Sequence, residues 1–469
     1  MINLTLLFAA LSLNLSLCNM YNIPEEELKE ELCPIPANEI WYTTNGNAEP
    51  IFPHAIDVFG ANILTNSYNA ERECWVITFD GDVTMVGDRA FWFCGDITTI
   101  TLPDSVKIIG NSAFSNCSMM TSITIGSGVT TIHDNAFRYC RSLTSITLPD
   151  SVTSIGDDVF SACSNLSEFK GQYTTRDGRC LVVNNTIIAY AEGSGTEYTI
   201  PDGVTAIGEC AFEDCATISC VIIPDSITTI GHDAFNSCSN LTSVSFGNGV
   251  TVIGDRAFAY CNMLSDIVLP KSVKIIGDSA FYECSNLSSI VIPNSVTTIK
   301  DSAFADCGLQ NITIGRSVTT IGGRAFEGSS GQLTIESRAV VEHDYGSENY
   351  PTNKFEGWLY GWLYGTSFNK IIIGSDAERI GNSIFRGCNS LTSVTIPNSI
   401  KDIGDYVFYG CSALKAIYLE AETPPTHGEH PFVGCAPELR IYVPTLSIEA
   451  YKCADGWTEY SNTIEEYNL

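Results

Sequence analysis

Histidine and carboxylate side chains that lie close together are the first places to look for metal-assisted chemistry. The histidine cluster of this 469-residue chain is His427-Gly428-Glu429-His430. A zinc protease places two histidines four residues apart on a helix, so that both face the metal. Here the two histidines are three apart, and Pro431 follows directly. The spacing therefore favours a plain loop over a metal site.

Acidic side chains could also act as a general acid and base. Glu336, Glu342 and Asp344 fall in an irregular stretch, and a hydrolase would need them to converge in one cleft. The glycine-rich run Gly328-Ser329-Ser330-Gly331 lacks the lysine of a phosphate-binding loop and is expected to form a turn. Because no complete catalytic set stands out, we expect that the chain is not an enzyme. A hydrolase using the acidic stretch remains the less favoured alternative.

A further set of carboxylates recurs at one position of a repeat. A column of carboxylates could bind calcium. An aspartate that caps a helical turn explains each of them without a metal, and other residue types (Asn111, Glu209, His232 and Gly323) interrupt the column. We therefore expect neither a metal nor another cofactor. The recurring residues are Asp88, Asp134, Asp157, Asp255, Asp278, Asp301 and Asp405.

The charge balance excludes some classes of partner. The chain carries 24 basic and 54 acidic side chains, a formal net charge of −30. Nucleic acids and anionic bilayers repel such a surface, so neither is expected as the main partner. No stretch after the N-terminus reaches the roughly 18 apolar residues of a membrane-spanning helix.

The first 18 residues resemble an export signal. Ile2 to Leu17 is mostly apolar, although no basic residue precedes it. Cys18 follows, as in a bacterial lipoprotein signal, but Leu17 is larger than the residue usually found before such a cysteine. We expect export, and both lipid attachment at Cys18 and free secretion stay open.

An internal repeat organises the rest of the chain. Segments starting at Ile100, Ile123 and Ile146 align over 23 residues each, and a phenylalanine marks each unit except an irregular one around residues 175–195. A fixed period of this length predicts a solenoid, here of about 15 coils. The marker residues are Phe91, Phe114, Phe137, Phe160, Phe212, Phe235, Phe258, Phe281, Phe304, Phe326, Phe385, Phe408 and Phe432, with a further unit expected at Phe355.

One unit shows what each coil should look like. Residues 146–149 alternate apolar and polar side chains, which predicts a short half-buried strand. Residues 152–155 form a second strand or extended turn. Asp157 is expected to cap one helical turn over residues 158–163, which would direct Phe160 and Cys163 inward. Since no unit can bury its apolar side alone, stacking must create the core.

The repeated pattern LPxSVTxIGxxAFxxCSxLTSI resembles the Treponema pallidum type of leucine-rich repeat found in BspA-like surface proteins. The resemblance implies a β-rich (α/β) repeat solenoid, a right-handed leucine-rich-repeat horseshoe or superhelix, with β caps at both ends. We place an N-terminal cap at 19–78, the solenoid at 79–435 and a C-terminal cap at 436–469. Irregular coils are expected at about 169–203 and 333–374.

The 19 cysteines follow the repeat more than a disulfide framework. Twelve of them lie three residues after a marker phenylalanine, and such a ladder of parallel side chains is too widely spaced for relaxed bridges. We expect these twelve to be buried thiols. The better disulfide candidates are Cys33, Cys74 and the pair Cys210 and Cys220, and any pairing among these and Cys180 and Cys453 stays open. The twelve are Cys94, Cys117, Cys140, Cys163, Cys215, Cys238, Cys261, Cys284, Cys307, Cys388, Cys411 and Cys435.

The outward position of the first strand is a candidate contact surface. Its residues are uncharged, and the stretch from Ile222 through Val268 to Val291 is the most apolar part. The high β propensity of these residue types explains the column equally well. The full column is Thr101, Thr124, Thr147, Thr199, Ile222, Ser245, Val268, Val291, Thr313, Ile372, Thr395 and Tyr418.

A tandem GWLYG sequence offers a second candidate. Trp358, Tyr360, Trp362 and Tyr364 lie in the long irregular stretch after the repeat of Phe326. Tryptophan and tyrosine often anchor interfaces and sugar platforms. They could equally pack the irregular stretch against neighbouring coils.

Similar proteins are exported and often surface-anchored, and several are implicated in adhesion. The resemblance therefore implies a non-catalytic cell-surface (outer-membrane-anchored) or secreted binding protein, and we expect a monomer. Its partner would be a protein or glycan on a host or neighbouring cell. A structural envelope or matrix protein that self-associates is the main alternative.

Overall fold

The computed structural model describes most of the chain, and it divides into two compact units. The first unit comprises Met1–Ala136 and Thr147–Ile155, and the second comprises Phe137–Ile146 and Gly156–Leu469. Each unit contains sheets and buried side chains of its own. The described residues are 35–46, 49–54, 57–191, 195–344, 363 and 365–467.

The first unit begins with antiparallel strands that lead into parallel coils. Strands β2, β3, β1, β5 and β7 form one sheet in that order, with β1 antiparallel to both β3 and β5, and β5 parallel to β7. A second, parallel sheet has the order β10-β8-β6-β4. The strands are β1 (Glu39–Thr44), β2 (Ile63–Asn69), β3 (Cys74–Phe79), β4 (Met85–Val86), β5 (Ile97–Thr101), β6 (Ile108–Ile109), β7 (Ser122–Thr124), β8 (Thr131–Ile132) and β10 (Ser154–Ile155), and β9 (Ser145–Thr147) lies where the two units divide.

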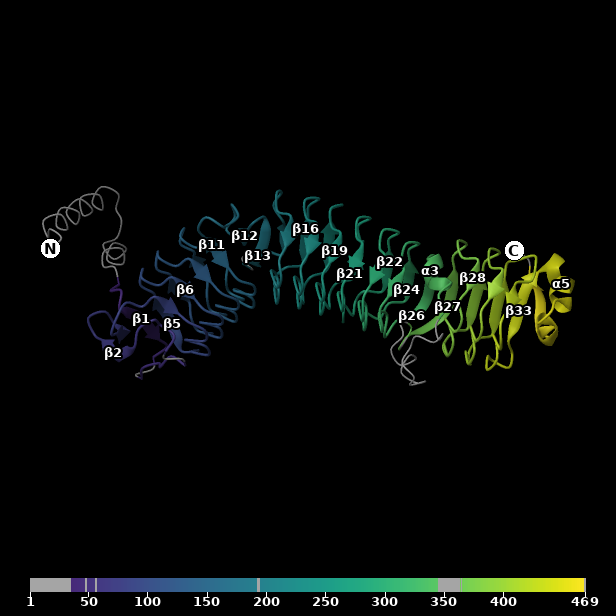
Figure 1. The fold of residues 1–469 in the computed structure, drawn as a ribbon, viewed down its shortest axis with the longest axis horizontal. Coiled ribbons are helices and arrows are strands. Elements are labelled where there is room, and N and C mark those ends of the chain that lie inside the picture. The colour runs from purple at the N-terminus through teal and green to yellow at the C-terminus, as the bar shows by residue number, and fades with distance from the viewer. Residues whose placement is uncertain are drawn as a thin grey trace. The chain divides into compact units, whose positions relative to one another are not determined.

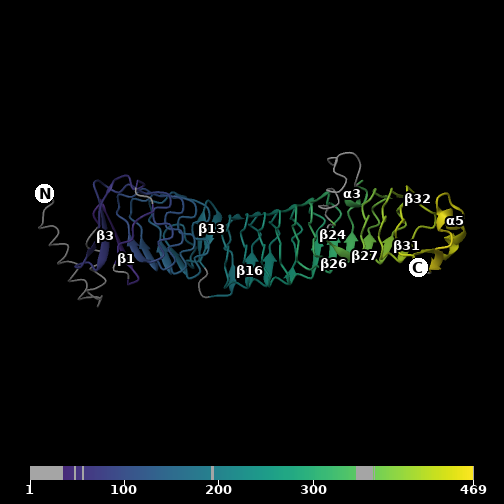
Figure 2. The ribbon, with the colours of Figure 1, turned by 90° about the horizontal axis from the view of Figure 1, so that it is seen from below.

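The second unit stacks longer first strands on one side of the coils (Figures 1 and 2). They form a four-stranded sheet, β14-β16-β18-β20, and an eight-stranded sheet, β22-β24-β26-β27-β29-β31-β33-β34. Strand β11 (Glu168–Lys170) belongs to neither sheet. The strands of the two sheets are β14 (Glu197–Thr199), β16 (Cys220–Ile223), β18 (Ser243–Phe246), β20 (Asp266–Ile267), β22 (Ser289–Ile292), β24 (Asn311–Ile314), β26 (Ser330–Ile335), β27 (Ser367–Ile373), β29 (Ser393–Ile396), β31 (Ala416–Leu419), β33 (Arg440–Pro444) and β34 (Ile464–Tyr467).

Shorter second strands line another side of the same coils. They form an eight-stranded sheet that starts at the antiparallel β12-β13 hairpin, and a three-stranded sheet, β28-β30-β32. The helices are α3 (Arg338–Val341), α5 (Ile448–Cys453) and two 3₁₀ turns, Thr445–Ser447 and Trp457–Tyr460. The strands are β12 (Cys180–Val183), β13 (Thr186–Tyr190), β15 (Ala206–Ile207), β17 (Thr229–Ile230), β19 (Val252–Ile253), β21 (Ile275–Ile276), β23 (Thr298–Ile299), β25 (Thr320–Ile321), β28 (Arg379–Ile380), β30 (Asp402–Ile403) and β32 (Thr426–His427).

The predicted repeat solenoid is confirmed, with about 16 turns of roughly 23 residues. Its core is a column of stacked phenylalanine rings. Phe235, Phe258 and Phe281 are fully buried, and their ring centroids are 5.1 and 5.3 Å apart with planes within 6° of parallel. Each ring therefore covers the next, so the core is continuous along the unit although no single coil could form it.

The predicted helical turn over residues 158–163 is wrong. The backbone there is a series of turns, and Asp158 and Ala162 both have φ of +58°, in the left-handed region. Left-handed residues at every fourth position cannot continue a right-handed helix. Phe160 and Cys163 are nevertheless buried, as the repeat predicted.

Hydrogen bonds between coils explain why the turn replaces a helix. In a regular coil, the backbone N–H groups of Asp233, Phe235 and Ser237 donate to the carbonyls of Asp255, Ala257 and Ala259 in the next coil, over 3.0, 2.8 and 2.9 Å. These donors would be used within the segment if it were helical. The turn thus makes a third hydrogen-bonded side of the solenoid.

Candidate functional site

The recurring cysteines form a ladder of free thiols, buried except for the half-buried Cys388 and Cys435. Many of these Sγ atoms donate to the carbonyl of the phenylalanine one coil earlier, as in Cys238 to Phe212 (3.1 Å) and Cys284 to Phe258 (3.1 Å). Burial raises the pKa of the Cys238 and Cys284 thiols, and it raises the pKa of Cys94 to about 12. Nucleophilic or metal-binding cysteines need the thiolate form. The burial and hydrogen bonding of these thiols are therefore those of a packing element.

The predicted disulfide candidates within the described residues are free thiols. Cys180 donates instead to the Tyr198 hydroxyl, over 3.1 Å, and Cys210 lies beside two carboxylates. The pairing of Cys210 with Cys220 is therefore wrong for this structure, and Cys33 lies outside the described residues. The free thiols are Cys74, Cys180, Cys210, Cys220 and Cys453.

The acidic stretch after β26 does not assemble a catalytic pair. The carboxylate of Glu336 lies 3.7 Å from the Arg316 guanidinium, and that of Glu342 lies 2.9 Å from the Arg338 guanidinium. Each carboxylate thus pairs with an arginine of its own, which is the pattern of ion pairs on the surface of a scaffold.

The protonation of these acids also argues against a hydrolase. Burial acts to raise the pKa of Asp344, but hydrogen bonds from Arg379 and from the Asn382 N–H outweigh it, so the pKa is lowered. The same balance lowers the pKa of Glu342. A general acid working near neutral pH needs a raised pKa.

His427 ends strand β32, and Gly428 to His430 lie in the loop that follows it, so only this part of the cluster is the loop that the spacing predicted. His427 packs its ring on Trp457, with centroids 5.3 Å apart, whereas His430 lies near Tyr406. Glu429 accepts a hydrogen bond from the Tyr406 hydroxyl over 3.1 Å. The two histidines therefore serve different contacts and do not share a ligand position.

The aspartate column bridges coils and does not cap helices. Asp255 Oδ1 accepts the backbone N–H of Asp278 (2.9 Å), Asp278 Oδ1 that of Asp301 (3.2 Å), and Asp301 Oδ1 that of Gly323 (2.7 Å). Each carboxylate is thus engaged by the coil that follows it. The helix-capping interpretation is wrong, and the interaction that replaces it also needs no calcium.

Replacing Asp301 with alanine is expected to lower the free energy of unfolding by about 1–2 kcal/mol, because the Gly323 N–H loses its acceptor. Asp301→Asn should cost much less, since Asn382 already accepts the Asp405 N–H in the same column over 2.8 Å. Thermal unfolding followed by circular dichroism would measure both. A calcium site predicts instead that both variants lose stability and that EDTA destabilises the wild type.

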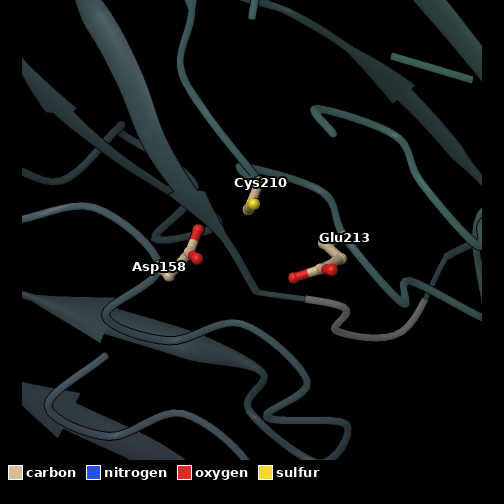
Figure 3. A group of neighbouring side chains, drawn as sticks. All are labelled: Asp158, Cys210 and Glu213. Carbon is tan, nitrogen blue, oxygen red and sulfur yellow. The ribbon is translucent and has the colours of Figure 1, made fainter. Parts of the chain in front are cut away.

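One cluster that was not predicted from the sequence lies beside the irregular coil. Asp158, Cys210 and Glu213 point toward one another, with potential ligand atoms within 4.8 Å (Figure 3). The guanidinium of Arg138 lies 3.3 Å from Glu213 and 3.7 Å from Asp158, and the Ser161 hydroxyl donates to Glu213. A cationic side chain thus already balances the carboxylates.

This cluster connects the turn of Phe160 with the turn of Phe212, which are 52 residues apart in sequence. Burial raises the pKa of Glu213 and the pKa of the Cys210 thiol. The irregular coil lies between these two turns in the sequence, and the side chains of the cluster connect the turns directly. We interpret the cluster as a structural ion-pair network. The only sequence signal for it is the long gap of 52 residues between the repeat phenylalanines Phe160 and Phe212.

The outward column of the first strands is where the chain exposes large apolar side chains in series. Ile222, Val268 and Val291 are 42%, 77% and 65% exposed. Their strand neighbours Val221 and Ile290 are buried. The alternation predicted from sequence therefore places the three aliphatic residues on the outer surface.

The other predicted contact residues are outside the part that the structure describes. Trp358, Tyr360, Trp362 and Tyr364 lie outside the described residues, as does Cys18. Within the described residues, no helix is both long and apolar enough to cross a membrane.

Comparisons with known proteins agree with this architecture. A family model for the BspA type leucine rich repeat region matches residues 61–178, 205–333 and 361–452. No curated protein matches the chain. A leucine-rich repeat protein from Bacteroides ovatus is 25% identical, with 92% of this chain and 100% of that one covered and a TM-score of 0.51.

Two further solved structures are similar over part of the chain. A leucine rich cell surface protein from Faecalibacterium prausnitzii is 34% identical over 48% of this chain and 62% of that one, with a TM-score of 0.45. A T. pallidum leucine rich repeat protein is 25% identical over 46% and 91%, with a TM-score of 0.28. The family model spans well over half of the sequence, and the chain therefore belongs to the BspA-type leucine-rich repeat family.

Proposed function

We propose that this chain is an exported, non-catalytic protein of the cell surface that binds another protein through the outer face of its first strands. The observation that carries the proposal is the exposure of Ile222, Val268 and Val291 in one column. A series of exposed aliphatic side chains on a rigid repeat scaffold is typical of an interaction surface. The family and the cell-surface description of the Faecalibacterium protein support this location.

The chemistry of the column favours a protein over a glycan. Sugar platforms are usually aromatic, whereas the exposed residues here are isoleucine and valine, with Ser245 between them. Glu197 and Asp266 are exposed on β14 and β20, the two end strands of the four-stranded sheet, and the whole chain carries a charge of −30. We therefore propose a partner with an apolar patch bordered by basic side chains.

A binding experiment with matched variants tests this proposal. Surface plasmon resonance would measure the full chain against immobilised extracellular-matrix proteins and, separately, against immobilised mucin-type glycans. We expect the double variant Val268→Asp, Val291→Asp to bind the protein surface at least about tenfold more weakly than the wild type. Both side chains are exposed, so the fold should persist.

The control introduces the same charges elsewhere in the same column. Thr124 and Thr147 are also exposed, and Thr124→Asp, Thr147→Asp should leave binding unchanged. Equal loss in both double variants would indicate a general charge effect. Equal binding by all three proteins, or binding only to glycans, would contradict the proposed surface.

A further inference from the structure

Strand β2 ends the sheet of the first unit with a free edge. It is the terminal strand in the order β2-β3-β1-β5-β7, so only β3 pairs with it among the strands that the structure describes. Leu64 and Tyr68 are 63% and 54% exposed. An exposed edge strand presents unpaired backbone groups that can pair with another chain.

The register shows which residues direct their backbone toward this edge. The Phe79 N–H donates to the Asn38 carbonyl on one side of β3, and the Asp80 N–H donates to the Asn62 carbonyl on the other side. Alternation places Thr65 and Ser67 in hydrogen-bonded pairs with β3. Asn66 and Tyr68 therefore direct their N–H and C=O groups away from the sheet.

The edge lacks two of the usual protections against pairing, charged residues and proline. Strand β2 contains no charged residue and no proline, although the chain has 54 acidic residues. A bulge between Ile63 and Thr65 contains Leu64, and residues 65–69 pair regularly with β3. By contrast β34, which ends the eight-stranded sheet of the second unit, carries Glu465 and Glu466. Charged side chains at an edge oppose pairing, so of these two edges only β2 is open to it.

We propose that β2 pairs antiparallel with β2 of a second copy of the chain, about a two-fold axis at Asn66. This register places Leu64 opposite the partner's Tyr68, and Tyr68 opposite the partner's Leu64. The two most exposed apolar side chains of the strand then cover each other, and the outward backbone groups of Asn66 and Tyr68 find partners. An uncharged strand allows two copies of an acidic chain to approach.

The contact between single strands is small, so the dimer is weak. We expect it to bury less than the roughly 1,200 Å² of a stable interface. The copies also repel each other through their negative charge, and salt screens that repulsion. Dimerisation is therefore expected to strengthen as salt concentration rises. This differs from the monomer that was expected from the sequence, and it is independent of the binding surface proposed above.

The two-fold register makes the test specific. Thr65 lies opposite the partner's Ser67, and both side chains are exposed. In a dimer of the double variant Thr65→Glu, Ser67→Glu, a glutamate of one copy therefore lies opposite a glutamate of the other copy at two places. In a dimer of the double variant Thr65→Glu, Ser67→Lys, a glutamate of one copy instead lies opposite a lysine of the other copy at two places. Sedimentation velocity of the full exported chain would measure dimer formation at concentrations up to about 100 µM, where a weak interface becomes populated.

We expect the wild type and the Glu/Lys variant to dimerise and the Glu/Glu variant to stay monomeric. Circular dichroism would confirm that both variants are folded. A wild type that stays monomeric at every concentration and salt level would overturn the proposal, as would equal dimerisation of the two variants. Monomers whose Asn66 and Tyr68 amides are protected from hydrogen exchange would show that another segment of the same chain covers the edge, which also overturns it.

Discussion

Replacing Phe258 with alanine is expected to lower the free energy of unfolding of the second unit by about 3–5 kcal/mol. The ring is fully buried between Phe235 and Phe281, and the Phe258 carbonyl accepts the Cys284 thiol. The missing ring would leave a cavity in the core. Strand and turn hydrogen bonds on three sides of each coil prevent the neighbouring coils from moving together to fill it. Denaturant unfolding followed by circular dichroism would measure the loss.

The matched control is Phe93→Ala in the first unit. Its ring is 57% exposed and contacts the Trp92 ring at a centroid distance of 4.5 Å. Removing a mostly exposed ring should cost less than about 1 kcal/mol. Similar losses for Phe258→Ala and Phe93→Ala would mean that the phenylalanine column does not hold the solenoid together.

Gly331→Ala is expected to lower the free energy of unfolding by about 2–5 kcal/mol, for two separate reasons. Gly331 has φ of +74°, and a methyl group there would lie 2.2 Å from the Gln310 carbonyl oxygen. The left-handed backbone costs an alanine about 1–2 kcal/mol, and relieving the overlap with a fixed strand costs about 1–3 kcal/mol more. Gly331 lies in β26, in the interior of the eight-stranded sheet.

Gly203→Ala separates these two contributions. Gly203 has φ of +91°, but nothing lies within 4 Å of the added methyl group. This variant should lose only the backbone contribution, about 1–2 kcal/mol. If the two alanine variants lose the same stability in the same denaturant experiment, close packing between the coils does not contribute at Gly331.

The repeat made the core predictable from the sequence. The same phenylalanine and cysteine positions recur in many units, so that burial of Phe258 and Cys284 could be inferred without any coordinates. Strand alternation likewise predicted that Val268 faces outward. These features depend on residue type and period, which repetition makes unambiguous.

Interactions between coils could not be predicted in the same way. Asp301 fits a helix cap by its local sequence, yet its carboxylate accepts the Gly323 N–H of the next coil. Arg138 and Glu213 meet although 75 residues separate them, because an irregular coil intervenes. A local sequence pattern does not show which residues of distant coils lie in contact. The lack of charged residues in β2 likewise indicates possible pairing only because the structure places that strand at the edge of a sheet.

Display of this binding scaffold on the cell surface is tested most directly by labelling one thiol. Among the described cysteines, Cys453 alone is exposed. A membrane-impermeant maleimide should label the wild type more than Cys453→Ser, and this Cys453-dependent label should be as large on intact cells as in lysates. Labelling of Cys453 only after lysis would place the chain inside the cell and contradict the proposed surface-binding function.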